Sequence, residues 1–311
     1  MGGSSTINGM LYSRGHPLDY DGWRQMGCEG WSFAEVLPYF KRSETNWRGD
    51  GPFHGGSGPL KVSRIEVERL LHTPVMEAAG QLGYPLTDDH HGPVPEGFGP
   101  GDATIDARGR RSSASRAYLD PIRSRPNLTI ETRAMATRIV IEGARAVGLD
   151  YLRGGAPHTV AASREVILAG GVYNSPQLLM LSGIGPADHL NEMGIAPVAD
   201  LPGVGRNLSE HAGYWLEYAT RAPVTLLNEL RADRLALSLA RWTVFGTGLL
   251  ATQSNSCHAE VRSRPGLAQP DLQVYFNPVR VDAKPWFPGI GRRQEHRLSA
   301  VACLVQPQSR G

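Results

Sequence analysis

Hydrophobic residues recur at a period of about two between residues 127 and 171, where short β-branched runs are separated by glycines. This pattern predicts a β-meander that returns to a buried strand over residues 164–169. Two later apolar runs, at residues 272–276 and 298–305, predict further strands. The last run is apolar on both faces, which is typical of an interior strand of a sheet.

Helix signals occupy other segments. Ser32 followed by Glu35 forms a capping box ahead of an apolar run, although Pro38 should kink this helix or move its start. Further helices are expected to begin at Thr73 before Pro74 and at Asn174 or Ser175, and to cover residues 187–193 and 229–245. The pattern changes after Tyr214, so we expect a mixed α/β chain with a second, discontinuous domain there.

Charge and composition exclude several classes of protein. The 311 residues contain 32 Lys and Arg against 30 Asp and Glu, and a net charge of +2 gives no reason to expect a nucleic-acid partner. The most apolar segment, residues 235–251, is interrupted by Arg241, so neither a transmembrane segment nor a secretion signal is expected. Three well-separated cysteines indicate no disulfide framework and no zinc motif, which favours a cytoplasmic setting. Peripheral association with a membrane is left open.

The first ten residues form a loop rich in glycines and hydroxyls. Gly2 and Gly3 lack the Cβ that would block the approach of an anion or a flat ring. The Ser4 and Ser5 hydroxyls can donate to phosphate oxygens, and Asn8 can both donate to and accept from a heteroaromatic edge. Such a loop is also typical of a plain structural turn.

Three separated segments resemble one family. Residues 2–10 read GGSSTINGM and are followed by Tyr12, Arg14-Gly15 and DYDGW; residues 170–185 read GGVYNSPQLLMLSGIG; residues 201–211 read LPGVGRNLSEH. In order and spacing these segments resemble the signatures of the glucose-methanol-choline (GMC) oxidoreductases. Within that family the sequence is most similar to choline dehydrogenases and related alcohol dehydrogenases.

This resemblance implies FAD as cofactor. It places the first loop along the diphosphate and flavin, and it lets the backbone of a later strand contact the adenine. The cofactor-binding residues that it implies are Gly2, Gly3, Ser4, Ser5, Asn8, Gly9, Met10 and Ala136.

The resemblance also implies a fold and a domain division. The fold would combine part of an FAD-binding domain of the glutathione-reductase-like class with part of an antiparallel-sheet substrate domain. The FAD-binding domain would comprise residues 1–58 and 106–213, and the substrate domain residues 59–105 and 214–311.

The implied reaction is oxidation of a small-molecule alcohol to an aldehyde or ketone by hydride transfer to flavin N5. Aliphatic or aryl alcohols are alternative substrates to choline, and a noncatalytic remnant of such an enzyme is the rival interpretation. The electron acceptor and the oligomeric state are not indicated.

Two family features are not found in the sequence. No G-x-G-x-x-G follows a strand, and none of the ten histidines fits the motif of the family's catalytic histidine, which lies in a more C-terminal segment. We therefore assign no catalytic residue, expect both ends to be cut relative to relatives, and expect the 311-residue chain alone neither to retain FAD nor to oxidise alcohols.

Other candidate sites are assigned plain structural roles. Residues 88–91, DDHH, contain metal-ligating types, but adjacent side chains diverge, so we expect a solvated loop and no metal. His211 beside Glu210 is interpreted as structural, and no G-x-S-x-G elbow supports a serine nucleophile. An aromatic cage for a quaternary ammonium, less expected than simple core packing, would draw on Trp215, Trp242, Tyr275, Phe276 and Trp286.

Overall fold

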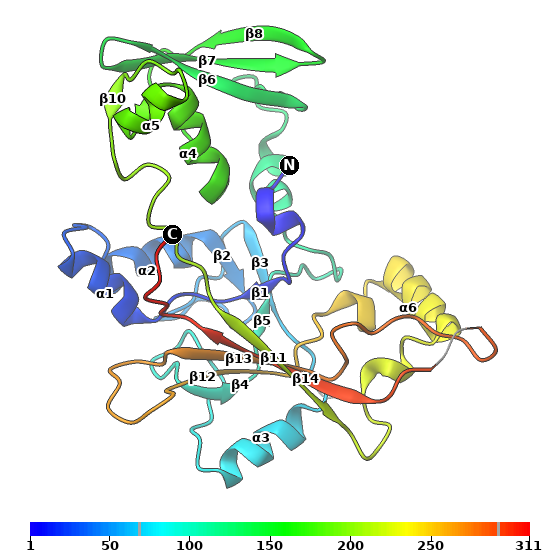
Figure 1. Cartoon of the computed structure of the whole chain (residues 1–311). Coiled ribbons are helices and arrows are strands. Elements are labelled where there is room, and N and C mark those ends of the chain that lie inside the picture. The colour runs from blue at the N-terminus through cyan, green and yellow to red at the C-terminus, as the bar shows by residue number, and fades with distance from the viewer. Residues whose placement is uncertain (68–69, 291–292) are drawn as a thin grey trace. The chain divides into compact units, whose positions relative to one another are not determined.

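The computed structural model describes residues 1–67, 70–290 and 293–311. The chain forms two compact units (Figure 1). Unit 1 comprises Met1–Arg125 and His211–Gln306, and unit 2 comprises Pro126–Glu210 and Pro307–Gly311. Helices and strands occur in both, so the mixed α/β class is confirmed.

A five-stranded antiparallel sheet is the largest element of unit 1. Its order is β11 (Gly213–Ala219), β14 (Arg297–Leu304), β13 (Leu272–Asn277), β12 (Cys257–Val261) and β4 (Gly97–Gly99). The two strands predicted at residues 272–276 and 298–305 therefore exist and pair directly. β14 has a neighbour on each side, which confirms the interior position expected from its two apolar faces.

A second, smaller sheet of unit 1 holds the start of the chain. Its order is β1 (Leu11–Tyr12), β5 (Asp102–Ala103), β3 (Leu60–Arg64) and β2 (Glu44–Asn46). Only β2 and β3 run parallel. The pairing of β1 with β5 fixes the residues that follow the first loop against a segment about a hundred positions away.

The described part of unit 1 also contains four α-helices: α1 (Pro17–Gln25), α2 (Phe33–Ser43), α3 (His72–Gln81) and α6 (Ala232–Phe245). The capping box of Ser32 and Glu35 is confirmed at the start of α2, and Pro38 lies inside that helix. α3 begins one residue before Thr73, with Leu71 in the left-handed region at φ 59°, so the predicted cap at Thr73 is wrong. Short 3-10 or π turns cover Gly3–Thr6, Ser115–Leu119, Asp120–Ile122, Leu226–Asn228 and Leu249–Ala251.

Among the residues of unit 1 that the structure describes, two hydrophobic clusters form the core. One joins the smaller sheet to the segment after β3 and contains Ile65, Val67, Leu70, Ala103, Ile105 and Leu226. The other lies between α3 and the five-stranded sheet and contains Ala79, Phe98, Cys257, Ala259 and Val261. Every member of both clusters is at least nine-tenths buried, so their removal from water stabilises this unit.

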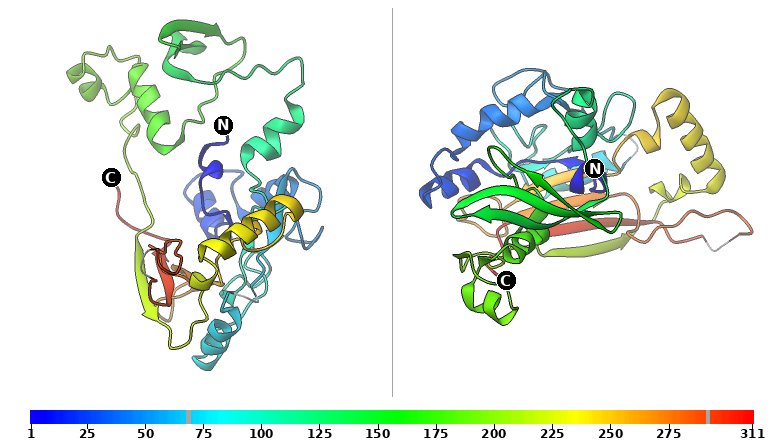
Figure 2. Two further views of the ribbon diagram at one scale, coloured as in Figure 1. Left: turned by 90° about the vertical axis from the view of Figure 1, so that its right-hand side faces the viewer. Right: turned by 90° about the horizontal axis from the view of Figure 1, so that it is seen from above.

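Unit 2 contains the predicted β-meander. β6 (Ala134–Glu142), β7 (Arg145–Arg153) and β8 (Ala156–Ala161) form an antiparallel sheet, drawn in green in both views of Figure 2. α4 (Gly171–Leu181) packs against β6, where the Ile139 amide donates to Ser182 Oγ at 2.8 Å. α5 (Ala187–Glu192) lies between the two short parallel strands β9 (Ile184–Gly185) and β10 (Ala199–Asp200) in the chain.

The strand predicted over residues 164–169 is wrong: this segment has no regular structure. Ile167 is 78% exposed. A strand needs a neighbour to satisfy its amides and carbonyls, and none of the described strands pairs with this run. The helix that follows begins at Gly171, earlier than the cap expected at Asn174 or Ser175.

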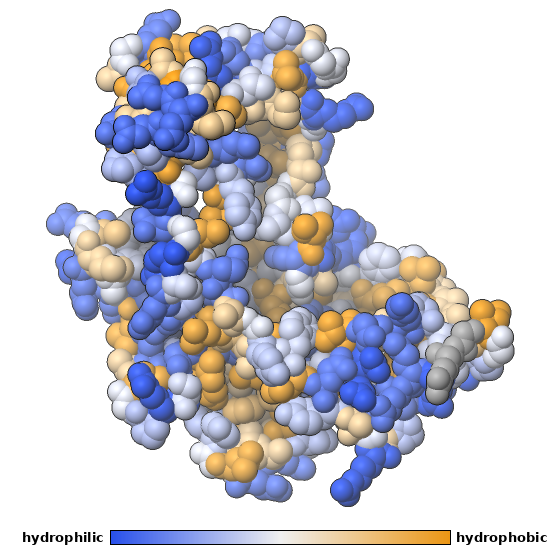
Figure 3. Space-filling model, in the orientation of Figure 1, coloured by the Kyte–Doolittle hydropathy of each residue, from blue (hydrophilic) through white to orange (hydrophobic). Residues whose placement is uncertain are grey.

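Among the described residues, no helix is both long and apolar enough to cross a membrane. Apolar residues nevertheless reach the surface of both units, where Figure 3 shows them interspersed with polar ones. In unit 1 several belong to β11, where Tyr214, Trp215 and Tyr218 are all more than half exposed.

Candidate functional site

The first loop is folded by contacts of its own glycines and serines. Gly2 is left-handed at φ 103°, and Gly3–Thr6 form one 3-10 turn. Ser5 Oγ donates to the Gly2 carbonyl and accepts from the Ala114 amide at 2.9 Å. The hydroxyl of Ser5 therefore holds the turn closed and ties it to the chain after β5.

Arg111 fixes the second half of the loop. Its Nη1 donates to the Asn8 side-chain oxygen at 2.7 Å, to the Asn8 carbonyl at 2.6 Å and to the Ser5 carbonyl at 3.2 Å. The Met10 amide donates to the same Asn8 oxygen at 3.1 Å. Because the carboxamide oxygen accepts two hydrogen bonds, the Asn8 NH2 is the group that it can offer to a ligand.

The loop ends at a second left-handed position. Met10 has φ 62°, and its carbonyl accepts from the Thr104 amide at 2.8 Å. β1 begins at the next residue and pairs with β5. The loop is therefore held at both ends by the segment that runs from β5 to Ser115.

Space remains in front of the loop. A Cβ built on Gly3 or on Gly9 meets no atom within 4 Å, whereas one on Gly2 meets Thr6 Oγ1 at 2.7 Å. The chain itself therefore does not fill the position next to Gly3, at which φ is 56° and a side chain would be strained. A flat or anionic group can approach this backbone closely, and the exposed Ser4 hydroxyl lies beside it. The residues present fit a phosphate-bearing, ring-containing cofactor.

Seven of the eight predicted cofactor residues lie in this loop of unit 1. The eighth, Ala136, lies in β6 of unit 2 at the position where the β6–β7 register shifts. The adenine contact of Ala136 stays a prediction.

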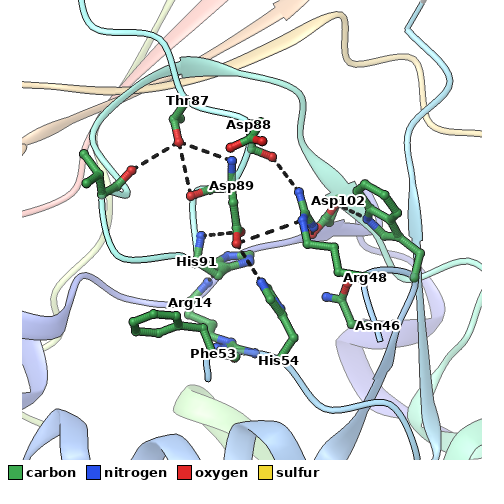
Figure 4. Close-up of polar contacts among 12 residues, drawn as sticks. Arg14, Asn46, Arg48, Phe53, His54, Thr87, Asp88, Asp89, His91 and Asp102 are labelled. Atoms are coloured by element: carbon green, nitrogen blue, oxygen red, sulfur yellow. Dashed lines mark hydrogen bonds and ion pairs between the residues drawn. The ribbon is translucent and has the colours of Figure 1, made fainter. Parts of the chain in front are cut away.

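A buried polar network begins at Arg14, four residues after the loop (Figure 4). Arg14 Nη2 contacts Glu44 Oε1 at 2.8 Å, and the two side chains are 3% and 0% exposed. His54 bridges two carboxylates, with Nδ1 3.4 Å from Glu44 Oε1 and Nε2 2.8 Å from Asp89 Oδ2. Arg48 lies 4.0 Å from that Asp89 oxygen and 2.6 Å from Asp102 Oδ2.

The charges in this network support one another. Burial alone would raise the pKa of Glu44, but His54, Tyr12 and Arg14 outweigh it and hold the pKa at about 2. Burial alone would lower the pKa of His54, but the adjacent Asp89 and Glu44 raise it to about 9. The network therefore carries paired charges near neutral pH and fixes the residues after the first loop.

Residues 88–91 form a loop in which Asp88 is exposed, but the expectation that the whole loop is solvated is wrong for the two histidines. His90 and His91 are 6% and 8% exposed. Adjacent side chains do diverge as expected: Asp89 faces His54, His90 Nδ1 lies 3.0 Å from the Pro95 carbonyl, and His91 Nε2 accepts from the Arg14 amide. His54 and Arg14 lie 35 and 77 residues away in the sequence, whereas Pro95 lies in the same loop as His90. These contacts make burial of the polar groups possible.

The five aromatic residues considered for a cage do not meet. Trp242 Nε1 donates to the Gly109 carbonyl, and Trp286 Nε1 donates to the Leu227 carbonyl. Tyr275 stacks on His258 and Phe276 packs near Phe98, while Trp215 is 54% exposed. In the described part of the chain, no ring pair within contact distance joins two of the five, and core or surface packing accounts for them.

His211, which is interpreted as structural from the sequence, is exposed.

An open cleft of about 610 Å³ lies beside the polar network in unit 1. Asp88 and Asp89 contribute to its wall together with Arg64 and His72. None of the predicted cofactor residues lines it.

Comparison with known protein families gives a match that includes the first loop. The sequence model described as GMC oxidoreductase matches residues 1–213, more than half of the chain. The chain belongs to the GMC oxidoreductase family. The resemblance of residues 2–10, 170–185 and 201–211 to that family is thereby confirmed.

Individual relatives agree. The oxygen-dependent choline dehydrogenase of Brucella suis biovar 1 (strain 1330) is 44% identical over 311 residues, which is 100% of this chain and 56% of the relative. A variant of the formate oxidase of Aspergillus oryzae RIB40, studied for FAD modification, has a TM-score of 0.87 at 25% identity and covers 99% of this chain and 59% of its own. Pyridoxine 4-oxidase from Mesorbium loti has a TM-score of 0.80 at 29% identity, with coverage of 99% and 56%. The chain spans about half the length of the curated relatives that it matches.

Proposed function

We propose that this chain is part of an FAD-dependent oxidoreductase that oxidises the CH–OH group of a small alcohol, with choline as the first candidate. The observation that carries the proposal is the loop of residues 2–10, which is open at Gly3 and in which Arg111 orients Asn8. Membership of the GMC family and 44% identity to a choline dehydrogenase support the same conclusion.

Different residues of the loop would contact different parts of the cofactor. Gly2 and Gly3 offer backbone that a diphosphate or a ring can approach, and Ser4 offers a hydroxyl donor. Asn8 offers its NH2 to an acceptor on the ring edge. A flavin held by these residues would supply the acceptor for the hydride of the alcohol carbon.

The division of the chain stays a prediction. Residues 1–58 and 106–213 would bind FAD, and residues 59–105 and 214–311 would face the substrate. A cytoplasmic location, expected from the isolated cysteines, also stays a prediction. An aromatic or aliphatic alcohol is the second candidate substrate, which the likeness to pyridoxine 4-oxidase supports.

A chimera tests the proposal. The chain replaces the segment that it matches in the Brucella suis choline dehydrogenase, and the purified protein is examined for flavin absorbance and for dye reduction with choline, benzyl alcohol and a short alkanol. We expect a yellow protein that turns over choline fastest. A folded but colourless chimera would contradict the FAD proposal and favour a noncatalytic remnant.

Two variants of the chimera isolate the loop. Gly3→Val should abolish flavin retention, because the branched side chain enters the space that is open at Gly3. Gly266→Val is the matched control: Gly266 also has positive φ, at 84°, and open space around it, but lies far from the loop in sequence. If both variants keep flavin equally, the role of the loop is refuted.

A further inference from the structure

Two potential metal ligands lie on one face of β12 in unit 1. His258 and Glu260 are two residues apart on this strand, so their side chains point to the same side of the sheet. They are 2% and 9% exposed. In the neighbouring strand β4 they lie opposite Gly99 and Gly97, which have no side chains to cover them.

His90 lies beside Gly99, in the space that this glycine leaves. Its ring centroid lies 4.3 Å from that of His258, and a Cβ on Gly99 would be 3.1 Å from His90 Nε2. His90 Nδ1 lies 3.0 Å from the Pro95 carbonyl, to which it must donate. The neutral ring therefore carries its lone pair on Nε2.

Two buried nitrogens of this group have no hydrogen-bond partner among the described residues. They are Nε2 of His90 and Nε2 of His258. An unsatisfied polar atom in the interior costs about 1–3 kcal/mol, so such atoms call for an explanation. One ligand atom from each of His90, His258 and Glu260 lies within 4.8 Å of the other two, and His258 Nε2 is 3.7 Å from Glu260 Oε1.

We propose that His90, His258 and Glu260 bind a zinc ion in unit 1. Two imidazole nitrogens and one carboxylate oxygen are a ligand set that zinc accepts, with a fourth position left for water. Zinc–ligand bonds of about 2.0–2.1 Å place tetrahedral ligands about 3.3 Å apart, so small side-chain movements from the observed separations complete the site. The ion would also offset the cost of burying the Glu260 carboxylate, which is 9% exposed.

Outer contacts already orient two of the ligands. The Pro95 carbonyl holds His90 in the tautomer that exposes Nε2, as is usual for metal-bound histidines. Gln273 Nε2 lies 3.4 Å from Glu260 Oε1, and the Tyr275 hydroxyl donates to Gln273. The ion would tie the loop before β4 to β12 and so lock one edge of the five-stranded sheet. This role is independent of the flavin proposal.

The 311-residue chain is the test protein. It is stripped with a chelator, titrated with ZnCl2 against a chromophoric competitor, and measured for bound zinc after gel filtration. We expect one zinc per chain, a thermal midpoint that rises with Zn²⁺ and not with Mg²⁺, and a Co²⁺ derivative with the intense visible bands of tetrahedral coordination. Absence of stoichiometric zinc, or an octahedral Co²⁺ spectrum, overturns the proposal.

Three near-isosteric variants locate the ligands: His90→Gln, His258→Gln and Glu260→Gln. Each should weaken zinc binding at least 100-fold, whereas His158→Gln, in unit 2, should leave it unchanged. Circular dichroism of the metal-free variants checks that they fold. If they do not fold, the Co²⁺ spectrum of the unaltered chain shows whether a tetrahedral metal site exists. Unchanged zinc binding in a folded His258→Gln variant would overturn the assignment.

Discussion

Arg111 donates through Nη1 to the side-chain oxygen of Asn8 at 2.7 Å, across 103 positions of sequence. The same nitrogen also donates to two carbonyls of the loop. A segment that precedes β1 is therefore shaped by a residue that follows β5.

Replacing this guanidinium should loosen the loop without unfolding unit 1. We expect Arg111→Met to speed hydrogen exchange at the Met10 amide about tenfold, which corresponds to about 1.4 kcal/mol. Arg108→Met removes a nearby exposed arginine and serves as the control. Equal exchange in the two variants would show that Arg111 does not hold the loop.

The Arg14–Glu44 pair should resist single substitution. Both side chains are almost fully buried, so Arg14→Met removes the cation closest to the Glu44 carboxylate and should lower the free energy of unfolding by about 3–5 kcal/mol. Arg123→Met breaks an exposed pair with Asp120 in the same unit and should cost less than about 1 kcal/mol. Urea unfolding followed by tryptophan fluorescence compares them, and similar losses would contradict the distinction.

His54 should make the stability of unit 1 depend on pH on the alkaline side. Its pKa is raised from 6.5 to about 9 in the folded chain. The protonated form is therefore stabilised by folding: the contribution is complete below about pH 6.5 and is lost as the pH rises through about 9.

Glu44 acts on the acid side, because its pKa is lowered to about 2 in the folded chain. Its contribution to stability is present above the unfolded pKa and is lost as the pH falls toward 2.

The effect of His54 can be measured in urea. Because its pKa is raised, urea midpoints measured from pH 5 to 10 should fall above pH 7 in the unaltered chain. The fall should be smaller in His54→Gln and unchanged in His158→Gln. A midpoint profile that His54→Gln leaves intact would refute the assignment.

Two glycines should respond to alanine in opposite directions. A Cβ on Gly55 would meet the Lys41 carbonyl oxygen at 1.8 Å, so Gly55→Ala must displace backbone and should be strongly destabilising. Gly80 lies in α3 with nothing within 4 Å of its Cβ position. Gly80→Ala should raise the free energy of unfolding by about 0.5–1 kcal/mol. Thermal unfolding of the two variants checks the order, and a destabilised Gly80→Ala would contradict it.

Local signals in the sequence predicted local structure well. The capping box of Ser32 and Glu35 and the β-branched runs of β6 to β8 are confirmed because their determinants are neighbours in the chain. The strand expected over residues 164–169 was wrong because a strand is defined by its partner, and hydrophobicity alone does not supply one.

The candidate site shows the same limit. The glycines and hydroxyls of residues 2–10 could be identified from their order, but nothing in the sequence marked Arg111 as their anchor. Likewise, the adjacency of residues 88–91 correctly predicted that their side chains diverge. It did not predict that His54, Arg14 and Pro95 contact these side chains. His54 and Arg14 lie 35 and 77 residues from Asp89 and His91 in the sequence, so these pairs are found only once the chain is folded.

The placement of β4 beside β12 has a consequence for synthesis. β4 leaves the ribosome on the order of ten seconds before its partner strand at bacterial or eukaryotic elongation rates of about 5–20 residues per second. All of Pro126–Glu210 emerges in that interval and can begin to fold first. The nascent chain therefore contains an unpaired β4 and an incomplete hydrophobic core while translation continues. A chaperone that shields unpaired strands would act during this period.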